Sequence, residues 1–259
     1  MNIEGGFTFA LCMRPPNSFE TIEEFISGSL LLIDKPLGWT SFDVLNKIKG
    51  FVKHKVAIPA NQHGHAQRFK IGHAGTLDPL ATGLLVICTG SLTRSIDSLQ
   101  AGSKEYTGTI TFGQTTPSFD LETQPQGDFS TEHLTTELLL TVAKSFEGEQ
   151  MQIPPGYSAK HIDGQRAYKA ARRGEHVEIP AVCIRVDAFD ITSFLNNEAT
   201  FRIACSKGTY IRTLAHEIGQ KSNSGSHLSS LRRSQSMPFH VNDAWSVETL
   251  LERLASFEK

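Results

Sequence analysis

Cysteine is scarce in this chain, and its spacing argues against two kinds of site. The 259 residues include four cysteines, Cys12, Cys88, Cys183 and Cys205, and none belongs to a Cys-x-x-Cys pair. Thiols this widely separated support neither a zinc site nor a disulfide framework. Three of the four lie in apolar or strand-like surroundings, so we expect those three to be small core residues.

Long apolar runs are also missing. No run approaches the roughly 20 residues that a bilayer-spanning helix needs. The N-terminus carries Glu4 and no basic segment ahead of an apolar one, which argues against a secretory signal. With 39% hydrophobic and 20% charged residues, the composition is typical of a soluble globular protein. We therefore expect a cytoplasmic, monomeric protein of one large domain, or of one domain with an appendage.

A surplus of basic residues is absent as well. The formal net charge is −2, whereas a domain that binds nucleic acid is often strongly basic. The charges are unevenly distributed, however, and local charge matters more than the sum. Residues 153–185 hold six basic and three acidic side chains, and residues 202–233 hold six basic and one acidic. These two basic segments are compatible with a polyanionic partner.

The first third of the chain begins with an extension, residues 1–28, which contains a short helix between Phe19 and Ile26. A buried strand is predicted at Leu30–Ile33. Thr40 can cap the next helix, with Asp43 at its third position. The apolar residues that then fall on one face of this helix are Phe42, Leu45, Ile48 and Val52.

The rest of the chain mixes strands and helices without a regular βαβ alternation. Alternating residues predict strands at Thr107–Phe112, Ile179–Leu195 and Thr200–Cys205. We therefore expect an α+β fold with a mixed, mainly antiparallel central sheet flanked by helices. Helical periodicity marks three further sets of residues: Leu134, Leu138, Val142 and Phe146, ending near Gly148; Ile211, Leu214, Ala215 and Ile218, ended by Gly219; and Val247, Leu250, Leu251 and Leu254.

A polar stretch between Lys53 and Lys70 is rich in histidine. It contains His54, His63 and His65. No carboxylate or cysteine joins these histidines at the spacing of metal ligands. We favour a weakly basic loop over a metal site.

A single carboxylate, Asp78, stands in a loop that is constrained by glycine and proline. Three glycines, Gly72, Gly75 and Gly83, allow backbone angles or close approaches that a side chain would forbid. The proline after Asp78 fixes its own φ and keeps Asp78 out of helical geometry. An isolated Asp-Pro pair would indicate only the start of a turn. Here the loop leads directly into an apolar segment, which favours a functional acid.

The whole string from Gly72 to Leu85 resembles the catalytic motif of the TruB-type tRNA pseudouridine synthases. Three further stretches match that family in the expected order, so the resemblance covers about residues 29–245. It implies the pseudouridine synthase fold for residues 29–259, with a thumb-like RNA-binding insertion at about 153–185. Many relatives carry a PUA domain after this point, and we expect none here because few residues follow Trp245.

The resemblance assigns roles around Asp78, which would be the nucleophile or the group that stabilises positive charge at the sugar. His73 would occupy or prop the space that the target base vacates. Lys35, in the family's opening motif, would brace the floor of the site. Tyr106, in Lys104-Glu105-Tyr106, would stack on the target base. The alternative for Tyr106 is a tyrosine at a sheet edge with its ring in the core.

Arg212 falls in the first turn of the helix predicted from Ile211, where the helix dipole prefers anions. An arginine there suggests a carboxylate or phosphate partner, whereas the alternative is a solvated surface arginine. By resemblance Arg212 pairs with Asp78, keeping that carboxylate ionised and oriented. Tyr210 would line the same pocket, and Thr209 can cap the helix.

The third match, Gln152–Lys160 followed by Gly164–Tyr168, leads into the thumb. Arg166, Lys169 and Arg173 are spaced to share one helical face, which suits RNA phosphates but equally a solvated basic helix. In the fourth match, His227–Arg233, Leu231 would pack near the flipped base. The basic residues expected to contact RNA are Lys160, Arg166, Lys169, Arg173, Arg232 and Arg233.

The implied activity is conversion of the T-loop uridine at position 55 of tRNA to pseudouridine. The target base must leave its stack, which costs a few kcal/mol and requires a pocket. No cofactor or metal is required, and the expected partner is the T arm of tRNA, with no membrane involved. Whether Asp78 attacks the ribose or the base stays open. The alternatives are a tRNA-binding folding chaperone and a synthase that acts on another RNA.

Overall fold

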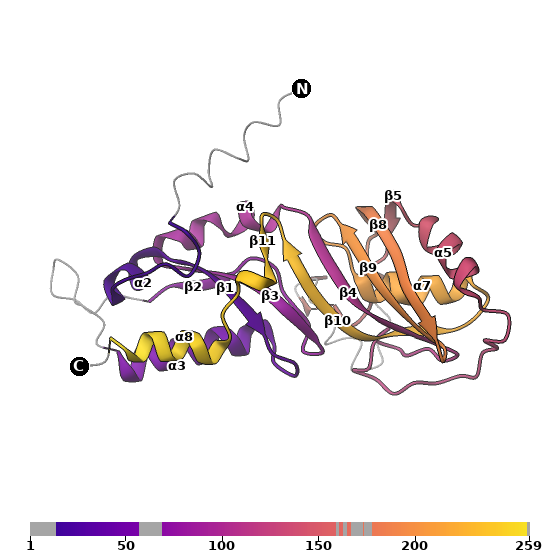
Figure 1. Cartoon of the computed structure of the whole chain (residues 1–259), viewed down its shortest axis with the longest axis horizontal. Helices are drawn as coiled ribbons and strands as arrows, with labels where there is room; N and C mark the ends of the chain where they lie inside the picture. Colours follow the sequence, from indigo (N-terminus) through magenta and orange to yellow (C-terminus); the bar gives the residue numbers. More distant parts are fainter. Residues whose placement is uncertain are drawn as a thin grey trace, which may run out of the picture. The chain divides into compact units, whose positions relative to one another are not determined.

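The computed structural model describes residues 14–56, 69–158, 161–162, 165–166, 173 and 178–257. The chain divides into two compact units, residues 1–102 with 234–259 and residues 103–233 (Figure 1). Among the described residues, no helix combines the length and the apolar character needed to cross a membrane.

The first unit is built on an antiparallel pair of strands. β1 (Leu30–Lys35) pairs along its whole length with β3 (Ala81–Thr89), from Leu30 opposite Cys88 to Lys35 opposite Gly83. β2 pairs with the C-terminal end of β3. The other elements of this unit are α2 (Ile22–Gly28), α3 (Ser41–Lys55), β2 (Ile71–His73), η1 (Gly90–Ser95), α4 (Ile96–Gln100), β11 (Phe239–His240), η2 (Val241–Asp243) and α8 (Val247–Ala255).

Side chains of β1 and β3 alternate between two buried clusters, as the two-residue period of a strand requires. Leu31 and Ile33 lie in the cluster that includes residues of α3 and α8, and these two helices lie side by side in Figure 1. Leu30 and Leu32 lie in the second cluster, with residues of η1 and α4 against it. Because β1 and β3 are buried on both faces, the ends of these two strands have fixed positions. The loop that precedes β3 is joined to one of these ends.

The described part of the N-terminal extension belongs to the core of this unit. Phe19, Phe25 and Ile26 are at most 3% exposed and lie in the cluster with α3 and α8. The short helix predicted within Phe19–Ile26 is present but shifted: α2 begins at Ile22, after its N-cap Thr21. Three buried apolar side chains are enough to make residues 19–28 part of the folded unit.

The second unit is a sheet with the strand order β10-β4-β9-β8-β5. The pairs β4–β9, β8–β9 and β5–β8 are antiparallel, and α5 packs against β8 and α7 (Figure 1). Parallel pairing occurs at isolated bridges such as Asp120–Leu228, so the predicted α+β, mainly antiparallel fold is confirmed. The elements are β4 (Lys104–Phe112), α5 (Thr136–Lys144), β5 (Gly148–Gln152), β6 (His161–Ile162), β7 (Gln165–Arg166), β8 (Val182–Leu195), β9 (Glu198–Cys205), α7 (Ile211–Lys221) and β10 (Ser226–Ser236).

The sequence prediction is wrong at several positions within elements that do form, Phe42 and Gly219 among them. Phe42 is 59% exposed, and Val44 takes its place on the buried face of α3, because the first turn of the helix turns Phe42 outward. Gly219 does not end its helix, which continues to Lys221. Gly219 instead allows a close approach, since a Cβ there would lie 2.6 Å from the backbone nitrogen of Ser226.

The described cysteines differ in burial. Cys88 and Cys205 are buried core residues, whereas Cys183 is exposed and Cys12 lies outside the described residues. Burial raises the pKa of the Cys88 thiol to about 12 and that of Cys205 to about 11. Such thiols stay protonated and unreactive at neutral pH.

Candidate active site

Asp78 lies in the loop that connects β2 to β3, three residues before β3 begins. The residue is half-buried, and its carbonyl accepts a hydrogen bond from the amide of Ala81 at 3.1 Å. Gly75 and Gly83 have φ values of 106° and 100°, angles that only glycine adopts without strain. Gly72 lies so close to Ile96 that a Cβ would approach it to 2.7 Å. The three glycines therefore shape this loop as predicted.

Both backbone neighbours of Asp78 are held by the segment between β1 and α3. The hydroxyl of Ser41 accepts from the Leu77 amide at 2.8 Å and donates to the Leu77 carbonyl at 3.1 Å. On the other side, the Pro79 carbonyl accepts from the Gly38 amide at 2.9 Å. Asp78 therefore sits between two residues whose backbone is held by hydrogen bonds.

Lys35 also contacts the loop that carries Asp78. Its side chain is fully buried, and its ammonium donates to the carbonyls of Pro36 at 3.0 Å, Trp39 at 2.5 Å and Pro79 at 3.5 Å. Backbone carbonyls thus satisfy a buried charge that would otherwise be very costly. The bracing role of Lys35 under the active site stays a prediction, and these hydrogen bonds are the contacts on which it depends.

The helix that supplies Ser41 begins as the sequence predicts. Thr40 and Asp43 form a complete capping box, in which each side chain accepts from the other residue's backbone amide. The hydrogen bonds from Thr40 lower the pKa of the Asp43 carboxyl. A capped helix start fixes Ser41, and through Ser41 the loop that carries Asp78.

His73 ends β2, where it lies opposite Ile87 of β3 and is half-buried. It precedes Asp78 by five residues on the same constrained segment. The strand therefore gives His73 a fixed backbone position at the start of the loop.

In the second unit, Arg212 is a buried side chain whose partners include one carboxylate and two backbone carbonyls. Its Nη1 lies 3.5 Å from the Oδ2 of Asp120, and both side chains are about 95% buried. The guanidinium also donates to the carbonyls of Ser118 and Tyr157, each at 3.2 Å. Asp120 is thus a carboxylate partner of Arg212 that the sequence reasoning missed, while the pairing of Arg212 with Asp78 stays a prediction.

The start of α7 is capped differently from the prediction. Tyr210, not Thr209, is the N-cap, and its own side chain makes no capping hydrogen bond. Thr209 donates to the carbonyl of Ser206 instead. The side-chain amide of Gln152 bonds both backbone groups of Tyr210: its Oε1 accepts from the Tyr210 amide at 2.8 Å, and its Nε2 donates to the Tyr210 carbonyl at 3.1 Å.

Tyr106 lies in β4, opposite Ile203, and is 9% exposed. Two residues earlier, Lys104 begins the strand and is 6% exposed. Burial, with a further contribution from the positive charge of Arg233, lowers the pKa of Lys104 to about 8. A buried amine of this kind titrates close to neutral pH, two residues along the strand from the predicted stacking tyrosine.

The described residues among those expected to contact RNA differ in secondary structure and in exposure. Arg166 lies on β7, which pairs with β6 as a short hairpin, so it does not share a helical face with Lys169 and Arg173. Arg173 is exposed, whereas Lys160 and Lys169 lie outside the described residues. Leu231 and Arg232 are half-buried in β10, and Arg233 is 1% exposed. A phosphate contact at the surface requires exposure, which Arg233 does not have.

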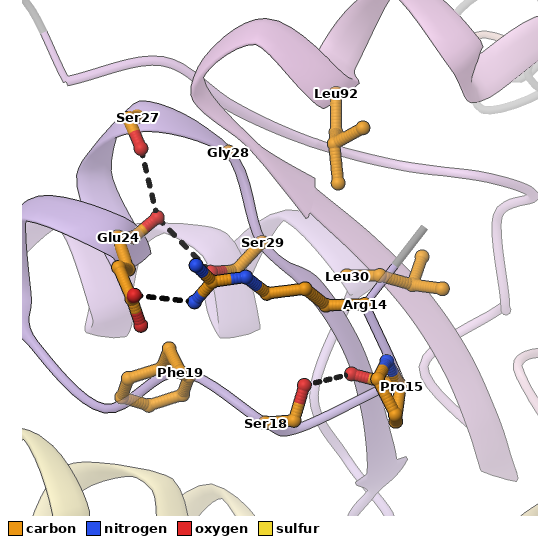
Figure 2. A pocket seen from close by; sticks show the side chains of 10 residues that line it. All are labelled: Arg14, Pro15, Ser18, Phe19, Glu24, Ser27, Gly28, Ser29, Leu30 and Leu92. Carbon is orange, nitrogen blue, oxygen red and sulfur yellow. Dashed lines mark hydrogen bonds and ion pairs between the residues drawn. The ribbon is translucent and has the colours of Figure 1, made fainter. Parts of the chain in front are cut away.

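A cavity of about 230 Å³ opens elsewhere in the first unit, between the segment before α2 and η1 (Figure 2). Arg14 and Glu24 form an ion pair across it, and Leu92 of η1 lines the opposite side. None of the predicted site residues lines this cavity.

Within the residues that the structure describes, no group of three or more histidine, cysteine, aspartate or glutamate side chains could hold a metal ion. His63 and His65 of the histidine-rich stretch lie outside those residues, and His54 is an exposed residue of α3. Taken separately, the first unit offers the Asp78 carboxylate on a loop whose backbone is clamped on both sides, and the second unit offers a buried arginine held by a second carboxylate. An ionised carboxylate of this kind can act as a nucleophile or stabilise developing positive charge.

Known proteins resemble the chain along nearly its whole length. Residues 63–211 match the N-terminal domain model of the TruB family of pseudouridylate synthases, and residues 212–259 match the model of the tRNA pseudouridylate synthase B C-terminal domain. The tRNA pseudouridine synthase B of Flavobacterium johnsoniae is 49% identical over 90% of this chain and 99% of its own length. That of Phocaeicola vulgatus is 45% identical over 89% of this chain and 94% of its own length.

The chain also resembles solved structures, at lower sequence identity than these relatives. A chain of a Cbf5-Nop10-Gar1 complex superposes with a TM-score of 0.65 at 27% identity, covering 93% of this chain and 60% of that chain. A chain of an H/ACA RNP bound to a substrate RNA containing 2'-deoxyuridine gives a TM-score of 0.62 at 25% identity, covering 90% of this chain and 55% of that one. This chain thus spans little more than half the length of those solved chains. By the match of its sequence to the family models and to relatives of nearly equal length, the chain belongs to the TruB family of pseudouridylate synthases.

Proposed function

We propose that this protein isomerises uridine to pseudouridine in tRNA, and that its target is the T-loop uridine at position 55. Relatives of nearly the same length that are named tRNA pseudouridine synthase B support this function. The observation that carries it is the loop of Asp78, whose neighbours Leu77 and Pro79 are clamped by Ser41 and by Gly38 with Lys35. A backbone held on both sides limits the positions that the Asp78 carboxylate can take, as catalysis by proximity and orientation requires.

The reaction breaks the bond between N1 of uracil and C1' of the ribose, rotates the base and joins C5 to C1'. The proton on C5 leaves and N1 gains one, so the product is an isomer of the substrate. In our proposal Asp78 is the nucleophile, with the choice between ribose and base left open. Tyr106 stacks on the target base and helps to remove the C5 proton, and His73 fills the space that the base vacates.

Arg212 has a proposed electrostatic function in this reaction. It keeps the carboxylate of Asp78 ionised, because a nearby cation stabilises the charged form. It also receives its own orientation from Asp120 and from the carbonyls of Ser118 and Tyr157. Tyr210 and Leu231 line the pocket for the base. These assignments follow the resemblance to the family residue by residue.

RNA recognition is proposed to rest on the thumb-like insertion at about 153–185 and on Arg232. Residues 29–259 then form the catalytic domain, a monomer that needs no small-molecule cofactor. A loop base is read by shape, stacking and phosphate contacts rather than by a base-pair code.

The test is pseudouridine formation in an unmodified tRNA transcript, followed by mass spectrometry, with wild-type protein and Asp78→Asn side by side. Wild type should convert the T-loop uridine. Asp78→Asn should form product at least about a thousandfold more slowly, because the amide is not a nucleophile, and should bind tRNA with nearly unchanged affinity.

A transcript with a disrupted T arm serves as the substrate control and should not be modified. Product from Asp78→Asn at the wild-type rate would contradict the assignment of the nucleophile. Tight tRNA binding without product from either protein would favour a folding chaperone. Product only at other uridines would favour a synthase for another RNA.

A further inference from the structure

Gln152 is the last residue of β5, and its side chain does not serve the sheet. It is 1% exposed, so both ends of its amide need hydrogen-bond partners inside the protein. Both partners belong to one residue: the Tyr210 amide donates to Oε1 at 2.8 Å, and Nε2 donates to the Tyr210 carbonyl at 3.1 Å. A glutamine amide thus pairs with the backbone of a residue 58 positions away.

Tyr210 is the N-cap of α7, where backbone amides lack partners within the helix. Its own side chain does not cap the helix, while its carbonyl already accepts from the amides of Thr213 and Leu214 at 3.1 and 3.3 Å. Gln152 adds a third donor to that carbonyl and satisfies the Tyr210 amide. The start of α7 is therefore fixed from outside the helix.

The same two segments meet a second time. Arg212, in the first turn of α7, donates to the carbonyl of Tyr157 at 3.2 Å. Residues 152–157 thus hold residues 210–212 at both ends: a side chain of the first segment binds the backbone of the second, and a side chain of the second binds the backbone of the first. Movement at either contact would displace Tyr210 and Arg212 together.

We propose that Gln152 is a positioning residue of the reaction, which sets Tyr210 and Arg212 through the backbone of the α7 N-cap. This inference rests on the proposed function, in which Tyr210 lines the pocket and Arg212 orients Asp78. The role requires a group that donates and accepts at once. A carboxylate accepts only, whereas a protonated carboxylic acid again offers one donor and one acceptor.

The variant Gln152→Glu tests whether position 152 must both donate and accept a hydrogen bond, because the protonation state of the glutamate changes with pH. A buried glutamic acid has a raised pKa, so at low pH the variant should reproduce both contacts and keep a rate within about twofold of wild type. At high pH the glutamate would be ionised and could no longer donate to the Tyr210 carbonyl, so two acceptor oxygens would face each other. The single-turnover rate at about pH 8.5 should then fall about tenfold or more relative to wild type, while the affinity for tRNA changes less than about threefold.

Among the described residues, Arg212 of α7 contacts this segment through the Tyr157 carbonyl and is itself paired with Asp120. Both are unchanged in the variant, so the ratio of variant to wild type at each pH cancels their own titration. Gln150→Glu is the matched control. Gln150 lies on the same strand and its Nε2 donates to the Phe146 carbonyl at 2.5 Å rather than to α7. Its rate ratio to wild type should stay constant with pH.

Gln152→Met keeps the length of the side chain, adds no charge and removes both contacts. It should lower the single-turnover rate about tenfold at every pH with little change in tRNA affinity, and circular dichroism at each pH verifies that each variant is folded. A pH-independent Gln152→Glu ratio close to one, or a loss confined to tRNA affinity, would overturn the inference while wild type remains active. Wild type without activity would overturn the proposed function and this inference with it.

Discussion

Arg212 and Asp120 show at the scale of single residues why a charge can stand where the helix dipole disfavours it. Arg212 occupies the first turn of α7, and burial to 4% exposure makes an unpaired guanidinium untenable. Asp120 supplies the opposite charge, and its Oδ1 accepts from the Glu122 amide at 3.0 Å. Breaking a buried pair of this kind costs about 3–5 kcal/mol, so neither residue is free to change alone.

His216, one turn after Arg212, supports the segment that carries Asp120. Its ring stacks on that of Phe119, with centroids 4.0 Å apart and planes inclined by 10°. Phe119 has a φ of 65°, a left-handed conformation that is strained for a bulky residue. Stacking on His216 therefore stabilises the backbone beside Asp120.

The titration of His216 gives a pH-dependent stability. Burial lowers the pKa of His216 in the folded protein, so the unfolded chain binds a proton at a higher pH than the folded protein. The stabilising effect of a neutral His216 is complete above its unfolded pKa, near about 6.5, and is lost as the pH falls below that value. In urea unfolding, wild type should lose stability between about pH 7.5 and about pH 5.5 more steeply than His216→Gln.

His54→Gln is the control for this experiment, because His54 is an exposed residue of α3. Its pH profile of unfolding should follow that of wild type. Equal slopes for wild type and His216→Gln would contradict the prediction.

At the scale of elements, glycine marks where helices and strands approach most closely. Gly219 of α7 faces Ser226 at the start of β10, and a Cβ there would lie 2.2 Å from the Ser226 hydroxyl and 2.6 Å from its amide nitrogen. The hydroxyl also donates to the carbonyl of Ala215 at 2.5 Å. The strand is thus tied to the helix, and neither backbone can move aside.

Gly219→Ala should destabilise the protein although alanine is the better helix former by about 1 kcal/mol. The steric overlap with Ser226 should outweigh propensity and lower the free energy of unfolding by about 1–3 kcal/mol, as measured in urea. Gly50→Ala in α3 is the matched control, since a Cβ at Gly50 meets nothing within 4 Å. It should stabilise by up to about 1 kcal/mol, and the same sign for both variants would contradict the argument.

At the scale of the whole molecule, several basic side chains of the second basic segment, residues 202–233, are paired or buried within the fold. In residues 202–233, Arg202 pairs with Glu105 at 2.6 Å and Asp190 at 3.1 Å, Arg212 pairs with Asp120, and Arg233 is buried. Much of that segment's positive charge therefore serves the fold. We therefore expect tRNA binding by this chain, whose net charge is −2, to depend more on the basic residues of 153–185 than on those of 202–233.

Salt dependence tests this division of charge. Replacing Arg166, Lys169 and Arg173 by glutamine should weaken tRNA binding and reduce the slope of log affinity against log salt by about 2, at about 0.7 per lost contact with single-stranded RNA. Filter binding across salt concentrations measures the slope.

The matched control replaces Lys47, Lys53 and Lys55, three exposed residues of α3, by glutamine. It removes the same charge at another place and should change the slope by less than about half as much. Equal slopes for the two triple variants would show that only the net charge of the protein matters, and would contradict the prediction that residues 153–185 contact RNA.

The sequence by itself determined the family, the α+β class, the capping box of Thr40 and Asp43 and the shape of the Asp78 loop. These depend on short-range causes: side chains that bond backbone three residues away, glycines with positive φ and periodic burial. Only the tertiary structure decided that Asp120 holds Arg212 and that Gln152 caps α7. Those partners are 92 and 58 residues apart in the chain, and no local pattern selects one carboxylate or amide among many until the sheet and helix bring them together.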